Sequence, residues 1–336
     1  MKTKNGIILG AVVAVLFAAG ILFQPKQHTA SINECGAVSV AEMNWSSAAF
    51  LGHLDKYILE TAFGCDVTMV AGATVGIATS LAEKSEPDIA SEIWASTIQE
   101  IVNESLDRGV AVIANQEPIT GGASENWYVL PKTLEAYPNL KTVADVLDNP
   151  EIFGGKIYIC PVGWGCHTTT QKIMQAYGAE EKGWELIEPG SGVGLDASIA
   201  KAGVSDEHWF GFYWEPAGMV AKFNMQPVPT GTGFAGDDHW ANCITNEECD
   251  TPKITEFSKP TLYSLASSRI SENSAVMQYL EARAIDINLF NSLIVKMDEQ
   301  QETAEESVEA FLKSYPEVWT AWFDESTVEI IKSSFN

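Results

Sequence analysis

The sequence predicts an α/β protein made of two similar units, followed by a helical C-terminal part. Short apolar runs with strand character alternate with segments whose apolar residues recur at helical spacing. This alternation occurs in residues 37–108 and again in residues 126–214. Such alternation is typical of largely parallel sheets covered by helices. The 336 residues suffice for two domains or one two-lobed unit, and ligands of such sheets bind beyond the carboxyl ends of the strands.

In the first unit, strand character at 37–43 is followed by a helical pattern at 48–63, which Gly64 ends. Further strands are predicted at 65–71 and 87–90, and further helices at 74–84 and 98–108.

The second unit begins with a strand that leads out of the first. Its predicted strands are 126–131, 156–160 and 209–214, and its helical segments are 134–137, 143–147, 168–177 and 198–202. The glycine-rich residues 190–194 lack the Lys-Ser/Thr ending of a nucleotide-binding loop, so we predict a plain loop near the cleft.

The last part of the chain starts with an irregular stretch at 230–259, rich in Gly, Asp, Asn, Thr and Pro. Strand character resumes at 261–267, and helices are predicted at 274–284, 287–300, 304–314 and 317–323.

The N-terminus has the pattern of an export signal. Lys2 and Lys4 precede an apolar run from Gly6 to Phe23. We predict a signal peptide or an uncleaved N-terminal anchor over residues 1–30. The mature chain is then periplasmic or otherwise extracytoplasmic.

The composition excludes one class of partner. A formal net charge of −25 leaves no basic footprint for nucleic acid. We expect a soluble monomer without a cofactor. The acidic loop Asp237–Asp250 offers oxygen ligands for a structural calcium ion, but it lacks EF-hand spacing and a solvated loop is favoured.

Six cysteines behind an export signal indicate disulfides, and six allow fifteen pairings. We predict the pairs Cys35–Cys65, Cys160–Cys166 and Cys243–Cys249. Their spacings do not fit a zinc site.

Several of the ten tryptophans follow predicted strands. A single tryptophan in such a place is more often core packing, but a set of them at equivalent strand ends favours a ligand role. Indole faces attract cations, and a quaternary ammonium has no N–H to donate. The candidates are Trp45, Trp94, Trp164 and Trp214, with Trp127 at the crossing between the units.

The segment from Cys160 to Cys166 is the most specific feature. A disulfide there closes a tight loop at the start of a helix, and the N–H groups of Gly165, Cys166 and His167 then face the cleft. A helix start binds anions, so this loop and the tryptophans together describe a betaine site. The alternative is a stapled surface turn with no ligand role.

Four motifs resemble the glycine betaine/proline betaine/choline substrate-binding proteins of ABC importers: Gly163-Trp164-Gly165-Cys166, Phe212-Tyr213-Trp214-Glu215-Pro216, Glu92-Ile93-Trp94 and Trp127-Tyr128-Val129. Within that group, Ala41-Glu42-Met43-Asn44-Trp45 and Glu125-Asn126-Trp127-Tyr128 are most similar to members that bind trimethylamine N-oxide. The resemblance runs from Cys35 to the C-terminus. It implies a type II periplasmic-binding-protein fold with a ligand cleft between two lobes, residues 34–125 plus 260–336 and residues 126–259.

The resemblance also implies roles for single residues. Trp94, Trp164 and Trp214 match the family's aromatic cage, and Gly165 and Cys166 match its backbone donors to a ligand carboxylate. Trp45 matches a cage position of the choline-binding relatives. Glu125 and Trp127 match positions of the N-oxide binders. Ile98 stands where some betaine binders have a histidine, which favours an N-oxide or choline over glycine betaine.

Glu125 also has a physical case of its own. A carboxylate beside the cage attracts a cation or shares a proton with an N-oxide, and it repels a ligand carboxylate. The alternative is an exposed loop acid.

The resulting prediction is a solute-binding protein that presents a methylated ammonium osmolyte to an ABC transporter permease. Two alternatives remain, a ligand-sensing receptor domain with the same pocket and an enzyme acting on methylamines. The enzyme lacks a convincing nucleophile, because Cys166 beside His167 is predicted to be oxidised.

Overall fold

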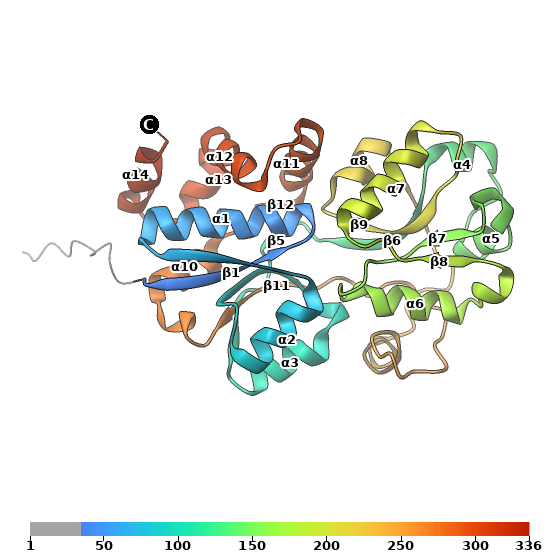
Figure 1. The fold of residues 1–336 in the computed structure, drawn as a ribbon, viewed down its shortest axis with the longest axis horizontal. Coiled ribbons are helices and arrows are strands. Elements are labelled where there is room, and N and C mark those ends of the chain that lie inside the picture. Colours follow the sequence, from blue (N-terminus) through green and yellow to red (C-terminus); the bar gives the residue numbers. More distant parts are fainter. Residues whose placement is uncertain (1–34, 336) are drawn as a thin grey trace, which may run out of the picture. The chain divides into compact units, whose positions relative to one another are not determined.

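The computed structural model describes residues 35–335, which are organised around two five-stranded sheets (Figure 1). The predicted export signal at residues 1–30 lies outside the described residues. Between residues 35 and 335, no helix has the length and apolar character needed to cross a membrane.

The first sheet has the strand order β2–β1–β3–β11–β4. Strand β1 pairs in parallel with β2 and β3, whereas β11 runs antiparallel to β3 and β4. Helix α1 lies on one face of the sheet, and α2 and α3 lie on the other (Figure 1). The bounds are β1 Ala37–Met43, α1 Ser46–Phe63, β2 Asp66–Gly72, α2 Thr74–Lys84, β3 Ile89–Trp94, α3 Gln99–Asp107, β4 Ala111–Asn115 and β11 Leu262–Ser267.

All six residues of β3 are buried, as expected of a central strand covered on both faces. Beside this strand, the guanidinium of Arg283 is fully buried and pairs with Asp55 of α1 at 2.8 Å. Asp55 also accepts a hydrogen bond from the Tyr279 hydroxyl at 2.6 Å. The core beside the first sheet therefore contains an ion pair as well as apolar side chains.

The second sheet has the order β10–β6–β9–β7–β8. Strand β7 is parallel to β8 and β9, and β6 is antiparallel to β9 and β10. Its elements are β6 Ser124–Val129, α4 Pro131–Ala136, α5 Val143–Leu147, β7 Lys156–Tyr158, α6 Cys166–Ala176, β8 Glu185–Ile187, α7 Gly192–Val204, β9 Phe210–Glu215, α8 Gly218–Phe223 and β10 Gln226–Val228.

Of the C-terminal helices, α12 and α14 pack along α1, whereas α11 packs mainly against α8 of the second sheet's elements. Beside them, β5 and β12 form a two-stranded parallel ribbon. The bounds are β5 Ile119–Thr120, α10 Ser274–Ala282, β12 Ile285–Asp286, α11 Ile287–Gln300, α12 Ala304–Ser314, α13 Pro316–Trp319 and α14 Glu325–Ser333.

Some local predictions were wrong. Residues 190–194 are not a loop, because α7 begins at Gly192 and the Ser191 hydroxyl caps it by accepting from the N–H of Gly194. The stretch 230–259 contains a short helix, α9 Asp237–His239, and a π-helical turn, Trp240–Ile244. Strand β3 starts and ends later than predicted, so Trp94 is its last residue.

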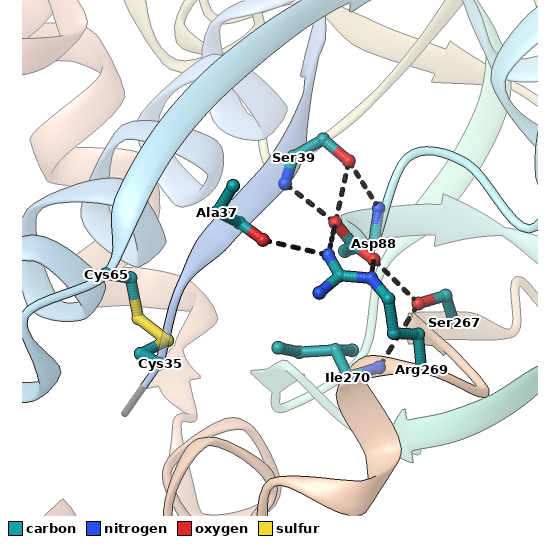
Figure 2. A network of polar contacts seen from close by, with 8 residues as sticks. All are labelled: Cys35, Ala37, Ser39, Cys65, Asp88, Ser267, Arg269 and Ile270. Atoms are coloured by element: carbon teal, nitrogen blue, oxygen red, sulfur yellow. Dashed lines mark hydrogen bonds and ion pairs between the residues drawn. A yellow bond between two sulfur atoms is a disulfide. The ribbon is translucent and has the colours of Figure 1, made fainter. Parts of the chain in front are cut away.

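The three predicted disulfides are present, joining Cys35 to Cys65, Cys160 to Cys166 and Cys243 to Cys249. Close to the first of them, a buried carboxylate ties together the amino-terminal ends of β1 and β3 and the residues after β11. Figure 2 shows Asp88 accepting hydrogen bonds from the backbone and hydroxyl of Ser39, from the Ser267 hydroxyl and from Arg269.

Candidate functional site

A cavity lies where residues from both sheets meet, and we call it the indole cavity. Its lining includes the end of β3, part of β6 and β9, and the first residues of α2 and α6. The lining residues are Trp45, Thr74, Trp94, Thr97, Glu125, Trp164, Gly165, Cys166, Phe212 and Trp214. Seven of the eight predicted site residues are therefore brought together.

The four indole rings form walls in different planes. Trp164 stands between two of the others, with its ring centroid 5.0 Å from those of both Trp45 and Trp214. The Trp164 plane is inclined by 60° to Trp45 and by 80° to Trp214. Because rings at such angles present faces and edges to one small volume, they can surround a compact, rounded group.

Hydrogen bonds fix three of these indoles. The N–H groups of Trp45 and Trp94 both donate to Oε1 of Glu92, at 2.9 and 2.8 Å. The Trp164 N–H donates to Asn44 at 2.7 Å, which links the loop before α6 to the end of β1. The Trp214 N–H is buried and has no hydrogen-bond partner among the described residues.

The loop that carries Trp164 and Gly165 is closed by the Cys160–Cys166 disulfide at the start of α6. A Cβ atom on Gly165 would lie 2.1 Å from the Thr97 hydroxyl oxygen, so only glycine permits this approach. The first N–H groups of a helix have no partner within it. One part of the prediction was wrong, because the N–H of His167 donates to the Trp164 carbonyl at 3.2 Å.

Glu125 is not an exposed loop acid. It lies on β6 directly opposite Trp214 of β9, and its side chain is 5% exposed. Burial raises the pKa of Glu125 to about 8. Its Oε2 has no hydrogen-bond partner among residues 35–335. With this pKa the group is largely a neutral acid at pH 7, able to donate a hydrogen bond.

The structure does not place Trp127 at the indole cavity. It lies two residues beyond Glu125 on β6, where side chains on alternate residues share a face, but its indole is 1% exposed and absent from the cavity lining. Its ring packs against Phe210 and Phe257, each with centroids 5.7 Å apart.

Sequence reasoning missed three lining residues, Thr74, Thr97 and Phe212. It also gave no role to Glu92, which lies behind the cavity. Phe212 and Glu92 belong to the motifs that carry the family resemblance. The two threonines had no distinguishing sequence pattern. Each follows a strand, and only the course of the backbone after that strand places the threonine at the cavity.

Between residues 35 and 335, no three His, Cys, Asp or Glu side chains gather as metal ligands. The acidic loop Asp237–Asp250, which lies within these residues, contains no such group. Every cysteine of the described chain is in a disulfide, including Cys166, so the structure offers no thiol beside His167.

A family model for the substrate binding domain of ABC-type glycine betaine transport systems matches residues 36–314. A search of curated proteins finds no match.

Solved structures share the fold. An ABC-transporter choline binding protein in complex with choline is 18% identical, with a TM-score of 0.70 over 90% of this chain and 99% of that one. A glycine betaine/L-proline-binding protein from Borrelia burgdorferi is 14% identical, with a TM-score of 0.67 over 88% of this chain and 99% of that one. A lactococcal protein complexed with glycine betaine is 15% identical, with a TM-score of 0.64 over 86% of this chain and all of that one.

These likenesses confirm the predicted two-sheet, type II periplasmic-binding-protein fold. The family match covers most of the chain and confirms the predicted family. The chain belongs to the family of substrate binding domains of ABC-type glycine betaine transport systems.

Proposed function

We propose that this protein is an extracytoplasmic, monomeric solute-binding protein that captures one small methylated ammonium compound in the indole cavity and delivers it to an ABC permease. The observation that carries the proposal is the cavity lining, in which four indoles surround one ionisable side chain, Glu125.

The chemistry of the lining suits a methylated ammonium group. Such a group carries a positive charge that is spread over methyl surfaces, so it loses little hydration on burial and is attracted by aromatic faces. Each desolvated cation–π contact contributes about 2 kcal/mol. Three or four such contacts are enough to hold a ligand that makes few hydrogen bonds.

Within this class we propose that trimethylamine N-oxide is preferred. A neutral Glu125 donates a hydrogen bond to the N-oxide oxygen without having to ionise. An ionised Glu125, in contrast, would repel the carboxylate of a ligand. Ile98 packs its Cγ2 atom near Gly165 and offers no basic group to clamp a ligand carboxylate. Choline remains the second ligand, because its cation can bind against an ionised Glu125.

We further propose that residues 34–125 plus 260–336 and residues 126–259 act as two lobes that close over the ligand. Three hydrogen bonds join these segments around the cavity: Trp164 Nε1 to Asn44, Val75 N to the Gly163 carbonyl, and Trp240 Nε1 to the Ser96 carbonyl. Two of the three involve the loop before α6, so ligand contact and closure use the same loop.

Tryptophan fluorescence titration tests the proposal with matched ligand pairs. Trimethylamine N-oxide and choline are expected to bind, whereas ethanolamine, which has the choline tail without the methyl groups, is not. Glycine betaine and glycine form a second pair. Equal responses to methylated and unmethylated partners, or no response to any, would refute the methylammonium proposal.

A further inference from the structure

Glu92 lies behind the indole cavity and does not line it. Its side chain is fully buried on β3, and its Oε1 atom accepts three hydrogen bonds. They come from Trp45 Nε1 at 2.9 Å, Trp94 Nε1 at 2.8 Å and the Ser47 hydroxyl at 3.1 Å. Any effect of Glu92 on a ligand must therefore pass through the two indoles.

The shared acceptor determines how these two rings are oriented. An indole N–H lies in the plane of its ring, so a fixed acceptor limits rotation of that plane. Trp45 precedes α1 and Trp94 ends β3, yet both donate to the same oxygen atom. Trp45 in turn contacts Trp164. Without the acceptor, two buried indole N–H groups would also lose their partner, which is costly.

The surroundings of Glu92 favour its neutral form. Burial raises the pKa of Glu92, and the hydrogen bonds from the two indoles and Ser47 only oppose that rise. Arg283 also favours the ionised form, but its guanidinium already pairs with Asp55. The second oxygen of Glu92, Oε2, is buried without a hydrogen-bond partner among residues 35–335. Glu92 therefore acts on the two indoles as a hydrogen-bond acceptor.

We propose that Glu92 is the positioning residue of the indole cavity: by accepting from both indole N–H groups at one oxygen atom, it holds Trp45 and Trp94 in the orientation that binds a methylated ammonium group. This inference rests on the proposed function. It predicts that loss of the acceptor oxygen weakens choline and trimethylamine N-oxide alike, whereas an uncharged acceptor in its place preserves the binding of both.

Two substitutions test the acceptor oxygen. Glu92→Gln keeps an acceptor oxygen for the indoles, whereas Glu92→Leu removes it. Glu42→Gln is the matched control, because Glu42 lies on the neighbouring strand β1, contacts His53 and does not line the cavity. Affinity for choline and for trimethylamine N-oxide is measured by calorimetry. Ring packing is measured by near-ultraviolet circular dichroism.

Glu92→Gln should bind both ligands within about threefold of the wild type, with an unchanged tryptophan dichroism signal. Glu92→Leu should alter that signal and weaken both ligands about tenfold or more, and Glu42→Gln should behave as wild type. Wild-type affinity in a folded Glu92→Leu protein, or a larger loss in Glu92→Gln, would overturn the inference. If Glu92→Leu fails to fold, Glu92→Gln still decides, because a loss of affinity there contradicts the acceptor role.

The two proposals fail differently. If the wild-type protein binds neither ligand, the proposed function is wrong. If the wild type binds both and a folded Glu92→Leu protein binds them equally well, the methylammonium function stands and the role of Glu92 is refuted.

Discussion

Proton linkage at Glu125 gives opposite predictions for a cation and for an N-oxide. Its pKa is raised by burial to about 8, and no basic side chain lines the cavity beside it. Choline should bind the ionised form, and trimethylamine N-oxide should bind the neutral form. The affinity for choline should therefore rise with pH, and the affinity for trimethylamine N-oxide should fall above pH 8.

The magnitudes follow from that pKa. At pH 6 about 1% of Glu125 is ionised, so choline should bind about 100-fold more weakly than at its high-pH plateau. At pH 7 each choline bound should release about one proton. The N-oxide should release about none, and its affinity should drop about tenfold between pH 7 and pH 9.

Isothermal titration calorimetry in two buffers of different ionisation enthalpy measures the number of protons released. Glu125→Gln keeps the size of the side chain and removes the titration. It should abolish the pH dependence of both ligands while retaining N-oxide binding, because the amide N–H can donate in place of the acid. Equal proton release for the two ligands, or pH slopes of the same sign, would refute the assignment of Glu125 as the selector.

The same group affects stability with a definite sign. The folded-state pKa of Glu125 is above the ordinary value, so between about pH 4.5 and pH 8 the folded state holds a proton that the unfolded chain has lost. Glu125 therefore contributes a decrease in the free energy of unfolding with rising pH, of about 1.4 kcal/mol for each pH unit in that window. Glu125→Gln should remove this contribution, while Asp196, whose pKa burial raises to about 7, keeps its own.

Two further variants test other parts of the structure. Gly165→Ala should weaken every ligand about tenfold or more with little change in Tm, because its Cβ would meet the Thr97 hydroxyl at 2.1 Å; Gly76→Ala, with open space around it, should bind normally. A normal affinity in Gly165→Ala would contradict the need for this close approach. Asp88→Asn should lower the unfolding free energy by about 2 kcal/mol in a denaturant titration at pH 7. Burial tends to raise the pKa of Asp88, but hydrogen bonds from Ser39 and Arg269 lower it overall, so its contribution is present above the ordinary Asp pKa and is lost as pH falls through the folded value. An unchanged acid-unfolding curve in Asp88→Asn would contradict this role.

Local patterns predicted the long elements well. Apolar spacing identified α1, α10, α11 and α12, and the run at 37–43 identified β1 with its observed bounds, whereas the last helix, α14, was missed. The short strands β8 and β10 were missed because three residues carry no periodic signal and are defined by partners distant in sequence. The start of helix α7 was missed because its first turn contains glycines, which have a low helix propensity. The Ser191 cap stabilises this turn instead.

The site was predictable where strand ends supplied the residues. Trp94, Trp164 and Trp214 follow or end strands, and all three line the indole cavity. The exclusion of Trp127 from the lining could not be foreseen, because it depends on how Phe210 and Phe257 cover that ring. The neutral state of Glu125 likewise results from burial, which the sequence does not reveal.

The most direct test of the aromatic cage is a calorimetric titration of Trp164→Ala with trimethylamine N-oxide. Trp164 contacts two other indoles, and loss of one desolvated cation–π contact of about 2 kcal/mol corresponds to a loss of affinity of about 30-fold. Trp184→Phe is the matched control, because Trp184 is buried beside Phe153 and donates to the Leu147 carbonyl, away from the cavity. The proposed function predicts a loss of at least 30-fold in Trp164→Ala and wild-type affinity in Trp184→Phe. Wild-type affinity in a folded Trp164→Ala protein would contradict it.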